Sequence, residues 1–152
     1  MNADEPGDWD AVFKPRVMSL TARIVAAVIA VAGLVVAVLN DRASGAYLRT
    51  ADQVAMGALA LIIAGSVLLL TRPRVKVGKS GLAVRNILGY RHIAWPEVVD
   101  VAFPPGKRWA RVELDYDEYV PAVAIQSVDG EQAVAAMDTI RNLMDRYASR
   151  KG

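Results

Sequence analysis

Two long apolar stretches dominate the first half of the chain, and an alternating pattern replaces them in the second half. Ile24 to Leu39 carries no charge, and extension back to Leu20 gives the roughly 20 residues that a helix needs to cross a bilayer. Gln53 to Thr71 is also free of charge. Helices that are apolar on every side belong in lipid or in a deep core. We therefore predict a transmembrane hairpin over residues 20–71, with spans at 20–39 and 53–71.

Two alternatives to a membrane hairpin stay open at this point. The stretches could be buried helices of a soluble protein, although the remaining chain is too small to bury both. The first stretch could instead be a cleaved signal peptide, with Lys14, Arg16 and Arg23 as its basic region and Ser44-Gly45-Ala46 as a cleavage site. The length of the apolar run and the acidic residues that open the chain argue against cleavage.

The distribution of basic residues predicts the orientation of the hairpin. Lys14, Arg16 and Arg23 precede the first span, four basic residues between Arg72 and Lys79 follow the second, and the linker has only Arg42 and Arg49. Because basic loops stay on the cytoplasmic side, we expect a cell-membrane protein with two spans and both termini in the cytoplasm. Residues 1–19 form a cytoplasmic N-terminal segment.

Aromatic residues in this N-terminal segment suggest a contact with the membrane surface. Trp9 and Phe13 are four residues apart, and Asp8 is a suitable N-cap. This pattern predicts a short interfacial helix that rests the two rings at the bilayer surface.

Small residues recur at helical spacing in both spans. In the first span they form one stripe, and in the second span they form two; close approach of backbones at such stripes drives helix association in lipid. The stripe of the first span comprises Ala22, Ala26, Ala30, Gly33 and Ala37, and those of the second comprise Gly57, Ala60 and Ala64, and Ala51, Ala55, Ala58 and Gly65. We expect the hairpin to pack on itself through one stripe and to offer Ala55, Ala58 and Gly65 to a partner helix.

The pattern after Pro73 has a period of two, which is typical of strands. Turn residues such as Lys79-Ser80-Gly81 and Pro104-Pro105-Gly106 separate the runs. Six short strands at this spacing predict an antiparallel sheet that curls into a barrel or sandwich, and we expect a small barrel within residues 72–152. The predicted strands are 74–77, 82–88, 91–95, 98–103, 109–114 and 119–126.

One amphipathic helix closes the chain. Asp129 is a suitable N-cap, with Gln132 three residues later. Apolar residues then recur at intervals of three and four: Val134, Met137, Ile140, Met144 and Tyr147. We expect this face to cover an open edge or end of the barrel.

Composition argues against most kinds of chemistry. The chain has no cysteine, one histidine (His92) and a net charge of +2. The absence of cysteine excludes disulfides, thiolate metal sites and a cysteine nucleophile. Gly78-Lys79-Ser80-Gly81 lacks the upstream glycine of a phosphate-binding loop, and Asp115, Asp117 and Glu118 lack an EF-hand frame. We expect no enzyme activity, no cofactor and no metal. The same acidic cluster argues against a continuous nucleic-acid groove.

The order of elements, strands followed by one C-terminal helix, resembles the pleckstrin-homology (PH) fold. Gly81-Leu82-Ala83-Val84-Arg85 followed by Arg91-His92-Ile93-Ala94-Trp95-Pro96-Glu97-Val98 is similar to the bacterial PH-like pattern. Two transmembrane helices placed before such a domain resemble a family of small actinobacterial membrane proteins. That resemblance implies a fold and a topology, an α+β PH-like domain behind a membrane hairpin, and implies no activity.

The resemblance also suggests where ligands bind. Lipid-binding PH domains carry basic residues on and between their first two strands, and Lys76, Lys79 and Arg85 lie in roughly that region. Basic residues near an anionic membrane surface contribute to binding, although positive-inside topology explains the same run. The candidate lipid or partner contacts are Lys76, Lys79, Arg85, Arg91, Lys107 and Arg108.

We therefore expect a non-catalytic, membrane-anchored PH-like interaction module at the cytoplasmic face. An accessory subunit of a larger membrane complex and a domain that binds anionic lipid headgroups are the alternatives.

Overall fold

The computed structural model describes residues 9–43 and 50–148. They form two compact units: one is Met18–Thr71, and the other combines the described parts of Met1–Val17 and Arg72–Gly152. The predicted Asp8 cap and most of the linker between the spans lie outside the described residues.

The first unit contains the two predicted helices. They are α1 (Arg16–Ala43) and α2 (Thr50–Leu68), and the short 3-10 helix η1 (Leu69–Thr71) extends α2. Both are long and apolar enough to cross a membrane, as judged from length and composition. The helices begin a few residues before the predicted spans because polar residues such as Arg16 and Thr50 are accommodated in the first turns.

Small residues mediate the contact between α1 and α2. Ala26 and Ala37 of α1 and Ala64 of α2 are buried. At Gly33 the two helices approach so closely that an added Cβ would overlap the Ala60 Cβ. The large side chains point outward; Leu34, for example, is 59 % exposed. Close backbone approach at small residues is the packing expected of helices in lipid.

The second unit begins with a strand that the sequence analysis missed. Trp9–Phe13 forms β1, which pairs antiparallel with β2 (Arg74–Gly78). The predicted interfacial helix is therefore wrong. Ala11 and Phe13 pack against the core while Asp10 and Val12 point outward, so the segment has a period of two. The hairpin is thus an insertion between two adjacent strands of one sheet.

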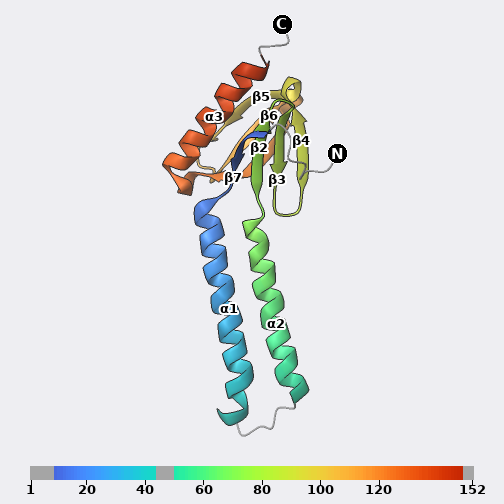
Figure 1. Cartoon of the computed structure of the whole chain (residues 1–152), viewed down its shortest axis with the longest axis vertical. Helices are drawn as coiled ribbons and strands as arrows, with labels where there is room; N and C mark the ends of the chain where they lie inside the picture. The colour runs from blue at the N-terminus through green and yellow to red at the C-terminus, as the bar shows by residue number, and fades with distance from the viewer. Residues whose placement is uncertain (1–8, 44–49, 149–152) are drawn as a thin grey trace. The chain divides into compact units, whose positions relative to one another are not determined.

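Within the described residues, seven strands form two antiparallel sheets (Figure 1). The first sheet has the order β1-β2-β3-β4 and the second the order β5-β6-β7. The remaining strands are β3 (Gly81–Arg85), β4 (Tyr90–Ala94), β5 (Val98–Ala102), β6 (Trp109–Leu114) and β7 (Tyr119–Gln126).

The sheets do not close into the predicted barrel. Between β4 and β5 the 3-10 helix η2 (Trp95–Glu97) interrupts the ladder. Pro96 has no N–H to donate to a strand pair, and within the described residues no ladder joins β1 to β7. The domain is therefore a two-sheet sandwich.

Large aliphatic residues from both sheets and one helix form a single core. Val75, Leu82 and Ile93 of the first sheet are fully buried, as are Val101 of the second sheet and Ile140 of the helix. Trp95 fixes one end of this core, because its Nε1–H donates to the Gly78 carbonyl at 2.9 Å. The predicted PH-like architecture, antiparallel strands with one C-terminal amphipathic helix, is confirmed.

The helix α3 (Glu131–Ala148) covers the core with a face slightly rotated from the predicted one. Its buried residues are Ala133, Ala136, Met137, Ile140 and Leu143. Val134, which we expected to face the core, is 62 % exposed. Val134 has the larger side chain and was therefore predicted to face the core, whereas the backbone of α3 approaches the sheets closely enough to favour the alanines.

The start of α3 also differs from the prediction. Asp129 lies in the 3-10 helix η4 (Ser127–Asp129), before the helix begins. Its Oδ1 accepts the Val17 N–H at 3.0 Å, and the Gly130 carbonyl accepts the first helical N–H groups, from Ala133 and Val134. Asp129 therefore ties the end of the N-terminal segment to the domain instead of capping α3.

Candidate functional site

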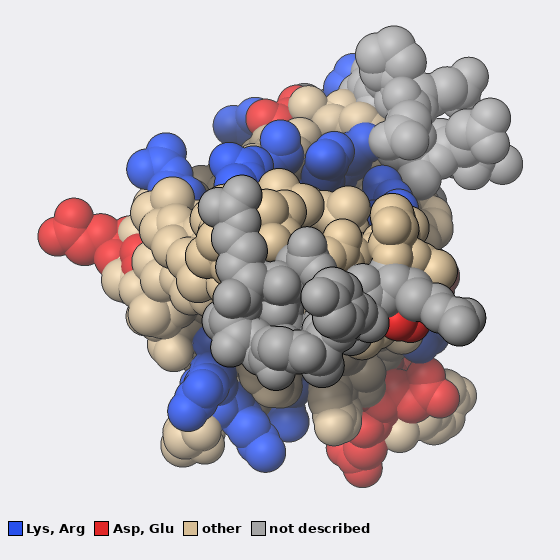
Figure 2. Space-filling view, turned by 90° about the horizontal axis from the view of Figure 1, so that it is seen from below, with Lys and Arg blue, Asp and Glu red and all other residues tan. Residues whose placement is uncertain are grey.

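The predicted basic contact residues do not form one site. Lys76 lies in the middle of β2, Lys79 in the β2–β3 turn and Arg85 at the far end of β3. Arg91 is on β4, and Lys107 and Arg108 are exposed in the loop between β5 and β6. From below, Lys and Arg side chains appear in separate groups (Figure 2).

The choice of Lys76, Lys79 and Arg85 also depended on a strand count that was wrong. The sequence analysis treated residues 74–77 as the first strand, whereas they belong to the second. The segment between the first two strands is the helical hairpin itself. The alternation of Ala11 and Phe13 with Asp10 and Val12 was the signal that identifies the first strand, and Trp9 lies beyond an irregularity in its register.

The indole of Trp9 covers the outer surface of the first sheet. Lys76 Nζ lies 5.8 Å from the ring centroid of Trp9. The ring centroids of His92 and Trp9 lie 6.3 Å apart in an edge-to-face arrangement. Ala83 pairs with both Lys76 and His92 and is buried on this outer face. His92 Nε2 also lies 3.4 Å from Ser80 Oγ. These contacts give His92 a place in a surface cluster of mixed aromatic and basic side chains.

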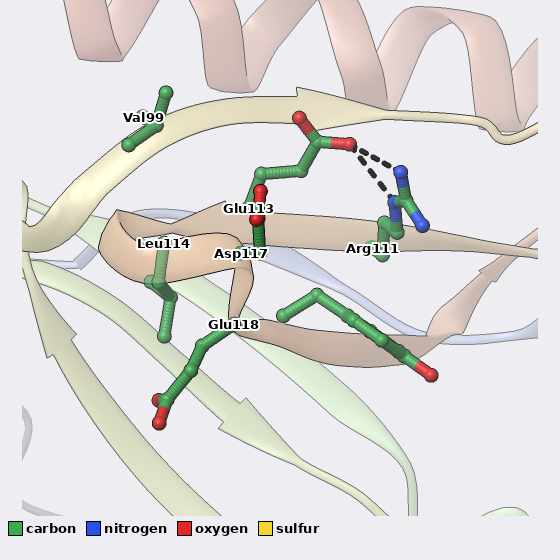
Figure 3. Close-up of a pocket in the computed structure, with 7 residues that line it drawn as sticks. Val99, Arg111, Glu113, Leu114, Asp117 and Glu118 are labelled. Atoms are coloured by element: carbon green, nitrogen blue, oxygen red, sulfur yellow. Dashed lines mark hydrogen bonds and ion pairs between the residues drawn. The ribbon is translucent and has the colours of Figure 1, made fainter.

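A small polar cavity of about 190 Å³ lies beside the β6–β7 turn (Figure 3). Arg111 Nε and Nη2 donate to Glu113 Oε1 at 2.9 and 2.7 Å. The Arg111 guanidinium also lies 5.4 Å from the Tyr119 ring centroid. Glu118 points away from this pair and approaches Arg91 at 3.6 Å. Three of the charged residues that line the cavity, Arg111, Glu113 and Glu118, are therefore already paired within the protein.

A larger, apolar groove of about 480 Å³ lies at the start of α3. Its apolar lining comes from Phe103, after β5, and from Ala133, Val134 and Met137 of α3, and Asp138 and Arg141 give it a polar margin. Exposure of Val134 at this position leaves apolar surface uncovered. The sequence analysis missed the groove because it assigned Val134 to the core.

The free edge of β5 runs beside this groove and is capped by side chains. Asp100 Oδ1 accepts the Val101 N–H at 2.7 Å, and Arg141 Nη2 donates to the Val101 carbonyl at 3.4 Å. β5 is an edge strand, and such strands need protection from unintended pairing. An incoming extended segment can add to this edge only after Arg141 moves.

Tyr147 links the end of α3 to β1. Its hydroxyl donates to Asp10 Oδ2 at 2.7 Å. The hydrogen bond to Asp10 raises the pKa of Tyr147 above its usual value of 10.0, with smaller contributions from desolvation and from the Asp10 charge. An ionised Tyr147 could no longer donate this hydrogen bond, and its negative charge would be repelled by the Asp10 carboxylate.

The predicted helix-packing residues fall into two groups. Ala26 and Ala37 are buried, and Ala30 and Gly33 are half-buried, within the hairpin. Ala55, Ala58 and Gly65 of α2 are exposed, and a Cβ added at Gly65 would meet nothing within 4 Å. The second group is available to other molecules.

Comparison with known proteins places this architecture in a family. Residues 72–143 match the Bacterial PH domain family. The chain is 54 % identical over 143 residues to uncharacterized protein Rv1417 of Mycobacterium tuberculosis and to uncharacterized protein Mb1452 of Mycobacterium bovis. In each case the alignment covers 93 % of both chains. No solved structure matches.

The chain therefore belongs to the family of these mycobacterial proteins and carries a bacterial PH domain behind two apolar helices. PH-like families are typically non-catalytic, and the family supports a role in interaction. The match runs from residue 72 to residue 143, so it includes β2 to β7 and most of α3 and leaves out β1.

Proposed function

We propose that this protein is a non-catalytic PH-like interaction module, anchored in the cell membrane by its helical hairpin, that binds a protein partner at the cytoplasmic face. The observation that carries the proposal is the open apolar groove between the end of β5 and α3, where Val134 is 62 % exposed. We expect neither a cofactor nor nucleic acid among its ligands.

The pairing of β1 with β2 supports the anchoring of the domain. β1 precedes the first apolar helix, and β2 follows the second. If both helices cross the bilayer, this pairing requires the two ends of the hairpin to be on the same side. Cleavage of a signal peptide after Ala46 would remove β1 from the sheet. The basic residues that flank the hairpin favour the cytoplasmic side.

The groove has the properties of a protein-binding surface. Apolar side chains form its floor, and a carboxylate and a guanidinium, from Asp138 and Arg141, lie at its margin. A partner side chain that enters it would bury apolar surface, at roughly 25 cal/mol per Å². The adjacent β5 edge could accept an extended segment of the partner once Arg141 leaves the Val101 carbonyl.

Site-specific cross-linking tests this function. The chain has no cysteine, so a Val134→Cys variant carries one thiol in the groove, and Asn142→Cys carries one on an exposed part of α3. In native membranes we expect a discrete cross-linked product from Val134→Cys and none from Asn142→Cys. Equal products from both positions, or none from Val134→Cys, would contradict a partner site in the groove.

A second candidate function is that of an accessory subunit in a larger membrane complex. The observation in its favour is the exposed small-residue face of α2, with Ala55, Ala58 and Gly65. Such faces allow a second helix to approach closely. In this case the hairpin would dock in the complex and the PH-like domain would cover its cytoplasmic surface.

Native sizing after mild-detergent extraction distinguishes this candidate. Ala55→Leu with Ala58→Leu adds bulk on the small-residue face, and Leu59→Phe with Ile63→Phe adds bulk on a different exposed face of α2. If α2 docks in a complex, only the first pair should release the protein as a small species. A small species for the unmodified protein would exclude a stable complex.

A further inference from the structure

One end of the groove at α3 lies next to the start of the first apolar helix. Ser127 and Gly130 line the groove, and Asp129 stands between them in the chain. Asp129 Oδ1 accepts the Val17 N–H at 3.0 Å. Val17 belongs to the same compact unit as the domain and is the second residue of the candidate membrane span Arg16–Leu39. If this span crosses the bilayer, this end of the groove lies close to the membrane surface.

The side of α3 that borders the groove is acidic. Glu131, Val134 and Asp138 follow one another at intervals of three and four residues, so they share one face of the helix, and all three are exposed. Within the described residues, neither Glu131 nor Asp138 has an ion-pair partner. Arg141 extends the same face, and its Nη2 donates to the Val101 carbonyl. The groove therefore combines an apolar floor with an acidic rim.

A segment that leaves the cytoplasmic end of a transmembrane helix has the complementary properties. Such segments carry an excess of Lys and Arg, and aromatic residues are enriched at the membrane interface. A large apolar side chain would fill the floor formed by Phe103, Val134 and Met137, and its basic neighbours would pair with Glu131 and Asp138. A partner in the same membrane is also confined near the groove, which raises its effective concentration there.

We propose that the groove takes the juxtamembrane segment of a second membrane protein, a segment with a large apolar side chain flanked by Lys or Arg. The inference rests on the proposed function, in which a protein partner occupies the groove. It adds where in the partner the bound segment lies and which charge that segment carries. A segment of a soluble protein, an acidic segment and a second copy of this chain are the competing occupants.

Photo-cross-linking from the membrane-proximal end of the groove tests the location of the segment. Ser127→Cys places the only thiol of the full chain beside the apolar floor and not within it. The thiol is labelled with a maleimide that carries a diazirine and is illuminated in native membranes, and the cross-linked peptide is identified by mass spectrometry. We expect a peptide within about 15 residues of an apolar span of the partner, with Lys or Arg beside the cross-linked residue.

The outcomes separate this inference from the proposed function. A cross-linked peptide from a soluble chain, from a region remote from any apolar span or from a second copy of this chain would overturn only the inference. A product from Val134→Cys but none from Ser127→Cys would do the same, because the occupant would not reach the membrane-proximal end. The absence of a product at both positions would overturn the function and the inference together.

Substitution of the acidic rim tests the charge of the segment. Glu131→Gln with Asp138→Asn, in the Ser127→Cys chain, removes two carboxylates. Exposed ion pairs each change binding by roughly 1.4- to 5-fold, so the yield of the cross-linked product should fall at least about twofold. The matched control, Asp115→Asn with Asp117→Asn in the exposed β6–β7 turn, removes the same charge and should leave the yield unchanged.

The sign of the change distinguishes a basic segment from an acidic one. The Arg108 carbonyl accepts the Ser127 N–H at 2.9 Å, so Arg108 lies beside the groove and would favour an acidic segment. A higher yield after removal of Glu131 and Asp138, or an equal loss in the control, would therefore overturn the inference. Because a carboxylate in the first turn of a helix is stabilising, Asp138→Asn alone is the second variant. It should lower the yield without a change in Tm.

Discussion

In the hairpin the buried residues are small and the large aliphatic residues are exposed, whereas in the PH-like domain large aliphatic residues form the buried core. Ala26, Ala37 and Ala64 are buried between the helices, while Leu34 is largely exposed. In the domain, Val77 and Ile140 are fully buried. In water, burial of large apolar side chains stabilises the fold. In lipid a leucine gains little from burial, because the lipid tails are equally apolar, so close packing of small residues determines which residues are buried. The contrast indicates that the two units are adapted to different solvents.

The largest effect is expected from truncation in the core of the domain. Ile140 is fully buried, so Ile140→Ala removes apolar contacts and leaves a cavity, at a cost of about 2–5 kcal/mol. Val134→Ala, on the same helix but exposed, should change stability by less than about 0.5 kcal/mol. Denaturant unfolding of the reconstituted protein, followed by the fluorescence of buried Trp95, measures both. Equal losses would mean that α3 presents another face to the sheets.

A steric substitution in the hairpin tests the opposite rule. Gly33→Val places a side chain against Ala60 and forces the helices apart, with an expected cost of about 1–3 kcal/mol. Gly65→Val meets nothing within 4 Å and should be tolerated in the isolated protein. Thermal unfolding in detergent compares them. If Gly65→Val is the more damaging, the helices pack through the other face of α2.

A buried hydrogen bond gives the next largest effect in the domain. Trp95→Phe keeps most of the ring but removes the donor to the Gly78 carbonyl. Loss of this bond leaves a buried acceptor without its partner and should cost about 1–3 kcal/mol. Denaturant unfolding followed by far-ultraviolet circular dichroism measures it. An unchanged stability would show that water replaces the indole.

The smallest effect is expected from the hydrogen bond between Tyr147 of α3 and Asp10 of β1. The pKa of Tyr147 is raised in the folded protein, so its bond to Asp10 is fully present below the unfolded pKa of 10.0 and disappears as the pH rises through the folded value. Stability should therefore decrease slightly above pH 10. Tyr147→Phe should remove this part of the pH dependence and lower stability slightly at neutral pH. An unaltered slope in the variant would assign the effect to other groups.

The sequence predicted elements well where one periodicity extended over many residues. The long apolar runs that end at Leu39 and Thr71 are compatible with few structures other than a helix, and α3 has a regular helical repeat. The prediction failed at Trp9–Phe13 because a spacing of four fits a helix turn as well as two steps of a strand. The whole hairpin separates β1 from β2 in the sequence. No local sequence pattern indicates that two such distant segments pair.

The candidate sites were harder to predict because they depend on which residues become neighbours. Trp9 reaches Lys76 and His92 only through the pairing of β1 with β2. Val134 was assigned inward from its hydrophobicity, yet the face of α3 is decided by how closely its alanines approach the sheets. Packing and register, not residue type, determine both surfaces.

The insertion of a membrane-spanning hairpin between two paired strands is the central claim, and cysteine accessibility tests it most directly. Single cysteines would replace Val12 in β1, Asn142 in α3 and Ser44 in the predicted external linker. With a membrane-impermeant maleimide, only Ser44→Cys should react in intact cells, and Val12→Cys and Asn142→Cys should react together after permeabilisation. Labelling of Val12→Cys and Asn142→Cys from opposite sides, or of all three from one side, would contradict the claim.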